Sequence, residues 1–281
     1  MPRSGGAWSA VPPGSEGVDG YIQLSWLDLA AASVFIVLNA AFSVLLSLRL
    51  ERQLLIASLR MVVQLLLIGL VLKVVFSAAS PWLTLLIALC MTGFASREIW
   101  ARQEKRLRGP WGFGLGAASM AVAGMAVTVF ALTLQLEPVP WWSPRYALPL
   151  FGMILGNTMT GVSLGLDTLH ATVARERPAI EARLLLGRTR WQALAPVARR
   201  ALRSGFTPIV NAMAATGVVS LPGMMTGQIL SGVDPQEAVK YQLLVMVLIG
   251  GATGLGVLGA VLGSVRRLTD SRHRLRLDRL R

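Results

Sequence analysis

The stretch GVVSLPGMMTGQIL, residues 217–230, decides how this chain folds, because it interrupts an apolar run that is otherwise long enough to cross a membrane. The run begins at Phe206, and about 20 apolar residues of helix span a bilayer core. Pro222 lacks a backbone N–H, and its ring would push away the carbonyl of Val218 in a continuous helix. Unsatisfied polar groups are costly in hydrocarbon, so this segment must face protein or a watery cavity.

The rest of the chain is also too apolar for an ordinary soluble domain. Of its 281 residues, 54% are hydrophobic and only 15% are charged, and the mean hydropathy is +0.59. Seven segments have the length and composition of spans, which predicts an all-α, polytopic transmembrane helical bundle. These segments are about 27–48, 54–76, 81–96, 112–135, 146–166, 206–231 and 239–263.

The distribution of positive charge sets the expected orientation. Nearly all of the 27 Lys and Arg residues follow the first, third, fifth or seventh segment. Only Arg3, Lys73, Arg145 and Lys240 are left for the other side. Cytoplasmic loops hold the positive charge of membrane proteins, so we expect the N-terminus outside and the C-terminus inside. Because the net charge of +13 is spread over every inner loop, it argues against a nucleic-acid partner.

This topology predicts three parts. Residues 1–23 are rich in Gly, Pro and Ser, lack a signal-peptide h-region, and are expected to form a flexible extracytoplasmic tail. Residues 24–265 form the transmembrane domain, with a long inner loop at about 167–205. Residues 266–281 form a basic cytoplasmic tail, which either only fixes the orientation or also contacts anionic membrane lipid.

The inner loop at 167–205 is patterned as two short helices at the membrane surface. Its apolar residues recur at roughly helical spacing: Ile180, Leu184, Trp191 and Leu194. Pro178 suits a first helical position, Gly187 a C-terminal cap and Thr189 a new N-cap. An amphipathic segment of this kind either rests on lipid or docks on a protein.

Within this loop, EARLLLG, residues 181–187, resembles the Glu-Ala-Ala-x-x-x-Gly loop by which importer-type ABC permeases engage their ATPase subunit. The spacing between Glu and Gly matches, whereas Arg183 stands where that motif has its second Ala. The resemblance implies that four residues couple the chain to an ATP-binding subunit: Glu181, Ala182, Gly187 and Arg188.

Further stretches strengthen this likeness. They are FGMILGNTMTGVSLGLDTL (151–169), the inner loop, TPIVNAM (207–213), GVVSLPGMMTGQIL and YQLLVM (241–246). Together they resemble the FetB-type permease family, which comprises bacterial iron-efflux ABC permeases and the similar plant aluminium-tolerance proteins. The resemblance covers about residues 24–265 and implies a permease subunit in a bacterial inner membrane. It also implies a homodimer with two separate ATPases that bind ATP–Mg, and export of iron or a related substrate.

The residues agree with an energy source outside the chain. No G-x-x-x-x-G-K-[ST] loop is present to hold ATP phosphates. A gradient-driven carrier would need carboxylates buried within its spans, whereas Asp28 and Asp167 lie at span ends. The sequence therefore favours an ATP-coupled permease without enzymatic activity or a bound cofactor of its own.

The break within residues 206–231 predicts a gate or substrate path, because broken transporter helices expose carbonyls and supply hinges. The predicted site comprises Pro222, Gly223, Met224, Met225, Gln228, Asn211 and Asn157. Thioethers suit Cu(I), whereas iron prefers oxygen or nitrogen ligands. The two methionines are therefore interpreted first as adaptable packing around a hinge and second as transient metal contacts. These residues select no particular metal, so an organic solute stays open as the substrate.

Two other functions stay open as alternatives. GVSLG, residues 161–165, fits the G-x-S-x-G pattern, and Asp167 and His170 follow Ser163 at four and seven residues. A nucleophile elbow, however, needs a strand, a sharp turn and a helix, and this stretch is continuous apolar helix. A membrane scaffold without transport would tolerate Glu181→Lys, which should disrupt ATPase docking in a permease.

Glycine pairs four residues apart predict close contacts between helices. They are Gly152 with Gly156, Gly161 with Gly165, Gly250 with Gly254 and Gly259 with Gly263. Small residues at this spacing let helix backbones approach each other in membranes. Such contacts serve either packing within one subunit or dimerisation.

Overall fold

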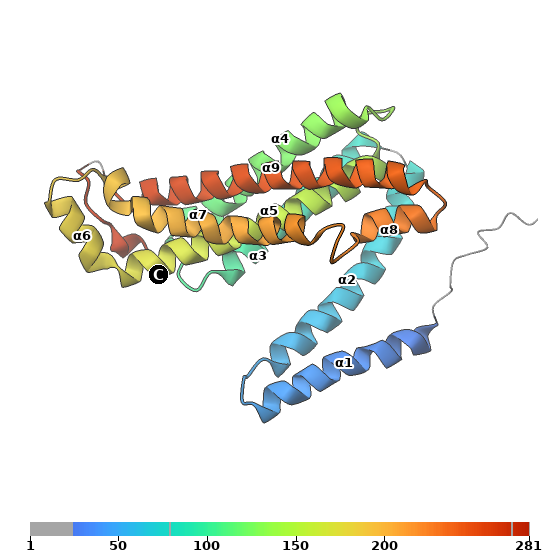
Figure 1. Ribbon diagram of the computed structural model, residues 1–281, viewed down its shortest axis with the longest axis horizontal. Coiled ribbons are helices and arrows are strands. Elements are labelled where there is room, and N and C mark those ends of the chain that lie inside the picture. The colour runs from blue at the N-terminus through green and yellow to red at the C-terminus, as the bar shows by residue number, and fades with distance from the viewer. Residues whose placement is uncertain (1–24, 79, 271, 281) are drawn as a thin grey trace, which may run out of the picture. The chain divides into compact units, whose positions relative to one another are not determined.

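The computed structural model describes residues 25–78, 80–270 and 272–280, which form an all-α protein (Figure 1), so the expected fold class is confirmed. The tail expected at residues 1–23 lies outside the described residues. In chain order the helices are α1 (Trp26–Leu45), α2 (Glu51–Ala78), α3 (Pro81–Arg102), α4 (Pro110–Ala131), the π-helical η1 (Leu132–Leu136), α5 (Pro144–Arg175), α6 (Arg177–Leu185), α7 (Arg190–Ala215), α8 (Gly223–Leu230), α9 (Pro235–Arg267) and the 3₁₀ turn η2 (Leu277–Arg279).

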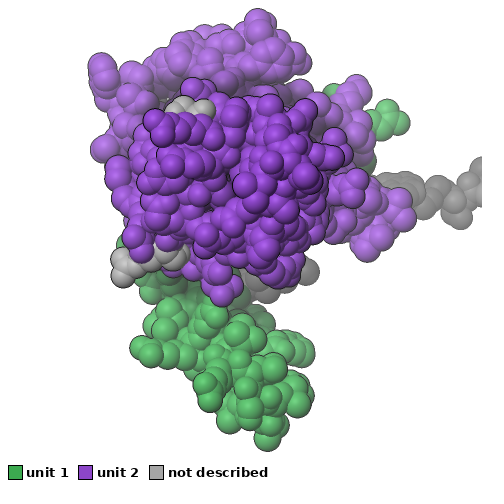
Figure 2. Space-filling model, turned by 90° about the vertical axis from the view of Figure 1, so that its left-hand side faces the viewer, with its two compact units in different colours: residues 1–68, 223–238 green, residues 69–222, 239–281 purple. Residues whose placement is uncertain are grey.

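The chain divides into two compact units, which Figure 2 shows in different colours. Unit 1 comprises residues 1–68 and 223–238, and unit 2 comprises residues 69–222 and 239–281. The chain passes between the units within α2, between α7 and α8, and near the start of α9. The second of these crossings coincides with the predicted break at Pro222 and Gly223.

Unit 1 contains α1, the first part of α2, and α8. Helix α1 begins with a capping box, in which the Ser25 hydroxyl accepts from the Asp28 amide and the Asp28 carboxylate accepts from the Ser25 amide. After α1, the buried Ser43 hydroxyl donates to the Glu51 carboxylate at 2.9 Å and accepts from the Leu50 amide at 2.8 Å. These bonds fix the turn between α1 and α2.

Six of the described helices are long and apolar enough to cross a membrane: α1, α2, α3, α4 with η1, α5 and α9. The segment expected as a further span, residues 206–231, is not one helix. Helix α7 ends at Ala215, residues 216–222 are irregular, and α8 has only eight residues. The number of spans and the orientation therefore stay predictions.

The break is wider than the proline kink predicted from the sequence. Gly217 has a φ of +87°, a conformation that favours glycine, and it turns the chain before Pro222 is reached. Val218 lies outside any helix, so Pro222 does not displace its carbonyl from an intrahelical bond. Pro222 instead comes directly before the first residue of α8, where a missing N–H costs little.

The expected inner loop at residues 167–205 is largely helical. Helix α5 extends to Arg175, and α6 follows as the first of the two predicted short helices. The second is wrong as predicted, because α7 continues for 26 residues from Arg190 to Ala215. Charged residues along α7 lower its hydropathy without ending the helix, which is why the pattern suggested a loop before Phe206.

Unit 2 is built around α5, which packs against α3, α4 and α7. Its core joins apolar residues of α3, α4, α5, α7 and α9, and it also includes Ile180 of α6. The most deeply buried of them have 0% exposure: Met120, Ile154, Leu169, Ile180, Leu194, Val257 and Leu268. A core that reaches α6 and Leu268 extends beyond the six long apolar helices to the elements at their basic end.

Glycines let α5, α7 and α9 approach each other closely. A Cβ atom on Gly161 would lie 2.8 Å from the carbonyl oxygen of Gly205 and 2.8 Å from the methyl group of Thr253. A Cβ atom on Gly205 would lie 2.6 Å from a methyl group of Val257. The pair Gly161 and Gly165 therefore serves packing within one subunit, one of the two uses left open by the sequence.

The end of the chain folds back onto unit 2. Leu107, between α3 and α4, pairs with Leu280 in an isolated antiparallel bridge, and the Arg108 N–H donates to the Arg279 carbonyl at 2.7 Å. The side chains of Leu275, Leu277 and Leu280 pack against the core. The described part of the basic tail is thus an ordered segment, and its contact with anionic lipid stays a prediction.

Replacing Gly161 by Ala should destabilise unit 2. The added methyl group must displace either the backbone of α7 or the side chain of Thr253, and overpacking of this kind costs about 1–3 kcal/mol. We expect a lower midpoint of thermal unfolding for the purified protein in detergent. Gly156→Ala is the matched control on the same helix, because nothing lies within 4 Å of its added Cβ atom. Equal midpoints for the two variants would show that this close approach does not limit stability.

Candidate functional site

Helix α6 forms an exposed corner between the two long helices α5 and α7. Ile180 is fully buried, and Leu184 packs against the core of unit 2. The next two side chains, Leu185 and Leu186, are 88% and 81% exposed. Clustered apolar side chains that a protein leaves exposed mark interaction sites. We call the segment from Arg177 to Arg190 the docking corner.

A Schellman motif ends α6 and sets the direction of the docking corner. The Arg188 amide donates to the Arg183 carbonyl at 3.2 Å, and the Gly187 amide donates to the Leu184 carbonyl at 3.0 Å. Gly187 has a φ of +80°, which is strained for any residue with a side chain. The C-terminal cap predicted at Gly187 is therefore confirmed, and it holds Leu185 and Leu186 on the last turn before the reversal.

Helix α7 begins directly after this motif. The Thr189 hydroxyl accepts from the Gln192 amide at 3.4 Å, and the Gln192 side chain accepts from the Thr189 amide at 3.0 Å. The N-cap predicted at Thr189 is thus confirmed as a capping box. The C-terminal segment supports the same point, because the Arg190 amide donates to Nδ1 of His273 at 3.2 Å.

Ion pairs connect the docking corner to α7. Glu176, between α5 and α6, accepts a hydrogen bond from the Arg200 guanidinium at 2.6 Å. This bond lowers the pKa of the Glu176 carboxyl below its usual value, so the pair stays charged in mildly acidic solution. Within α6, Arg177 pairs with Glu181 at 2.8 Å.

The structure brings the four predicted coupling residues together on the docking corner. Ala182, Gly187 and Arg188 are exposed, whereas Glu181 is partly buried. Leu185 and Leu186 were missed as site residues. The signal for them is the run of three leucines before the glycine, because one short helix can turn only part of such a run toward the core.

The predicted gate residues are divided between the two units. Unit 2 contains Asn157, Asn211 and Pro222, and unit 1 contains Gly223, Met224, Met225 and Gln228. Asn157 and Asn211 are both exposed, and Asn157 donates to the carbonyl of Met153 on its own helix at 2.8 Å. Oε1 of Gln228 is buried and has no hydrogen-bond partner among the described residues. Their convergence in one substrate path stays a prediction.

His, Cys, Asp and Glu side chains do not gather in groups of three or more that could hold a metal ion, within the part of the chain that the structure describes. The buried His170 lies with one ring nitrogen 3.0 Å from the Lys105 carbonyl and the other 2.7 Å from the Ser264 hydroxyl. It therefore joins α5 to α9 and to the connection between α3 and α4.

The geometry contradicts the serine-hydrolase alternative. Ser163 is buried within the uninterrupted helix α5, so it does not form a nucleophile elbow. His170 is engaged by Lys105 and Ser264, and the Asp167 carboxylate accepts from the Glu104 amide at 3.0 Å. Both supposed triad partners have structural contacts instead.

These features define the class: an all-α membrane protein with several long apolar helices and a docking corner at its basic end. The chain belongs to the UPF0014 family, described as an uncharacterised protein family, whose profile matches residues 26–269.

Three relatives illustrate the family. The UPF0014 membrane protein slr1647 of Synechocystis sp. is 40% identical over 233 residues, which are 81% of this chain and 87% of the relative. The probable iron export permease protein FetB of Escherichia coli is 33% identical over 255 residues, 90% and 96% of the two chains. Protein ALUMINUM SENSITIVE 3 of Arabidopsis thaliana is 33% identical over 225 residues, 80% of each.

These relatives confirm the resemblance to FetB-type and plant aluminium-tolerance proteins. The chain is a membrane transport component rather than an enzyme. No solved structure matches the chain significantly.

Gly187→Ala should loosen the docking corner. A side chain in the left-handed conformation costs about 1–2 kcal/mol, so the Schellman motif should open more often. Hydrogen–deuterium exchange should become faster at the amides of residues 186–188. Arg188→Ala is the matched control, because the motif uses only the backbone amide of that residue. Unchanged exchange in Gly187→Ala would contradict a cap that depends on glycine.

Proposed function

We propose that this chain is the permease subunit of an ABC-type exporter, driven by ATP that a separate subunit hydrolyses. The observation that carries the proposal is the pair of exposed leucines, Leu185 and Leu186, on a capped helix outside the long apolar spans. An apolar pair of this kind fits a hydrophobic pocket on a partner protein. Exposed Arg188 next to it would contact acidic groups at the rim of that pocket.

The fold supplies a route from this contact to the gate. Helix α7 begins at the docking corner and ends before the break at residues 216–222, so it extends roughly 39 Å between them. Arg200 on α7 is tied to Glu176 at the base of α6, so a displaced α6 would pull on α7. The chain crosses from unit 2 to unit 1 at Pro222–Gly223, where irregular backbone can absorb a rotation.

The substrate proposed is iron or a related metal. Support comes from the relative of Escherichia coli, whose name is probable iron export permease. The oxygen atoms of Asn157, Asn211 and Gln228 are ligands of the type that iron accepts, and Met224 and Met225 are soft contacts. A small organic solute is the second candidate, because neither amide nor thioether groups select strongly for one ion.

The assembly proposed is a homodimer of this chain with two ATP-binding subunits in a bacterial inner membrane. ATP–Mg binds to the ATPase subunits in this scheme. Relatives from Escherichia coli and Synechocystis support a bacterial membrane. Exposed Gly156, with open space around it, leaves one predicted glycine position free for a contact between two copies.

Leu185→Glu combined with Leu186→Glu should abolish binding of the ATP-binding subunit, because two buried carboxylates would have no partner in an apolar pocket. Co-purification of the co-expressed subunits in detergent measures this loss. Val139→Glu is the control. Val139 is 98% exposed and lies before α5, whose 32 residues separate it from α6 by roughly 48 Å. Full retention of the ATPase by the double variant would exclude the docking corner as the binding surface.

Pro222→Ala should slow ATP-driven transport while the complex still assembles. Alanine restores a backbone N–H and relaxes φ, so the joint between α7 and α8 can take up helical structure and stiffen. The measurement is ATP-dependent accumulation of ferrous iron, other metals and small organic solutes in vesicles that contain both subunits. A wild-type rate in the variant would argue against the hinge. Accumulation of organic solutes alone would replace iron as the substrate.

A further inference from the structure

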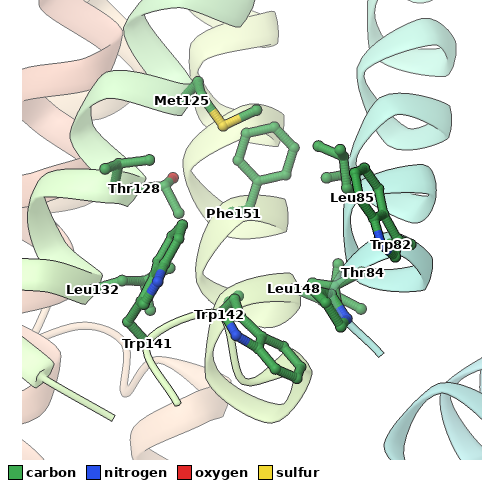
Figure 3. Close-up of a pocket in the computed structure, with 14 residues that line it drawn as sticks. Trp82, Thr84, Leu85, Met125, Thr128, Leu132, Trp141, Trp142, Leu148 and Phe151 are labelled. Atoms are coloured by element: carbon green, nitrogen blue, oxygen red, sulfur yellow. The ribbon is translucent and has the colours of Figure 1, made fainter. Parts of the chain in front are cut away.

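A separate cavity of about 340 Å³ lies at the end of unit 2 opposite the docking corner. Its walls come from the first turns of α3, the last turns of α4 with η1, the first turns of α5, and the connection that precedes α5. Figure 3 shows Leu85 and Trp82 of α3 on one side, Met125 and Thr128 of α4 on the other, and Phe151 of α5 between them. The volume lies within the range of about 300–1,000 Å³ that is usual for ligand sites.

The lining of this cavity is apolar and aromatic. None of the side chains that line it is charged, so the cavity offers neither a counter-charge for a metal ion nor one for an anion. Its two hydroxyl groups are already bonded within their own helices: Thr84 donates to the Ser80 carbonyl at 3.0 Å, and Thr128 donates to the Gly124 carbonyl at 2.7 Å. The interior therefore suits a hydrocarbon ligand and not the metal proposed as the transported substrate.

Tryptophans mark the rim of the cavity. Trp82 and Trp141 are 78% and 51% exposed, and Trp142 is partly buried beside them. Tryptophan is enriched where membrane helices meet the interface, since its ring is apolar and its N–H donates to polar lipid groups. The deepest wall is formed by Leu148 and Phe151, which are 4% and 3% exposed.

We infer that this cavity binds one acyl chain of a membrane phospholipid, with the ester and phosphate groups at the tryptophan rim. The three helices that form the walls belong to those long and apolar enough to cross a membrane, so hydrocarbon chains are the molecules that surround its opening. Burying a chain in an apolar cavity is favourable by about 0.8 kcal/mol for each CH₂ group when the alternative is water, and here it also removes an empty space between helices. The bound chain joins α3 to α4 and α5, a role separate from ATPase docking and from transport.

Photolabelling of the full-length protein tests this inference. Vesicles of phosphatidylcholine would contain a trace of phosphatidylcholine with a diazirine on its acyl chain, and mass spectrometry would locate the labels. We expect labels on Leu148 and Phe151, which bulk lipid cannot reach unless a chain enters the cavity. Val122, which is 70% exposed on α4, reports labelling by bulk lipid. Labels on Val122 without labels on Leu148 and Phe151 would overturn the inference.

A variant that fills the cavity provides the second arm. Ala88 lines the cavity, so Ala88→Phe should abolish labelling of Phe151 while Val122 stays labelled. Leu89→Phe is the matched control, because Leu89 is 55% exposed and does not line the cavity. Persistent labelling of Phe151 in a folded Ala88→Phe variant would exclude the cavity as the site.

Competition with the wild-type protein in detergent micelles requires no variant and distinguishes the source of the chain. Unlabelled phosphatidylcholine should suppress labelling of Phe151 at lower concentration than palmitic acid does. The reverse order would overturn a phospholipid and identify a free fatty acid as the occupant.

Discussion

The contact between the backbones of α5 and α7 at Gly161 and Gly205 is the constraint on which the arrangement of unit 2 depends. Neither glycine can take a side chain without meeting the carbonyl oxygen of the other or a methyl group of α9. Close contact of this kind replaces the hydrophobic driving force, which is weak between helices surrounded by lipid. It also fixes the path of α7, which connects the exposed corner at α6 with the break at residues 216–222.

The two ends of unit 2 have different chemistry. At one end, arginines, capped turns and two exposed leucines form a surface suited to a protein partner. At the other end, three tryptophans surround an apolar cavity without a charged side chain in its lining. Because α5 extends from one end to the other, the same helix buries core residues shared by both regions. This separation lets one end bind a motor subunit while the other interacts with the bilayer.

Local signals in the sequence predicted much of the docking corner. Pro178, Gly187 and Thr189 each act through the backbone of their own turn, so their roles as helix boundaries could be read without knowledge of the fold. The continuity of α7 could not, because hydropathy reports how apolar a segment is and charged residues do not end a helix. The prediction at Pro222 located the interruption correctly but made it too narrow, since the turn at Gly217 leaves no hydrophobic signature.

The sequence by itself determined that this is an all-α membrane protein, that its positive charge lies on alternate loops, and that the segment at 217–230 is broken. Composition and short-range backbone chemistry are sufficient for each of these. Only the tertiary structure decided that Leu185 and Leu186 face outward while Leu184 packs inward, that Gly161 meets Gly205, and that Trp82 and Trp141 share one cavity with Phe151. These relations join residues of different helices or depend on which face of a helix meets the core, and packing settles both.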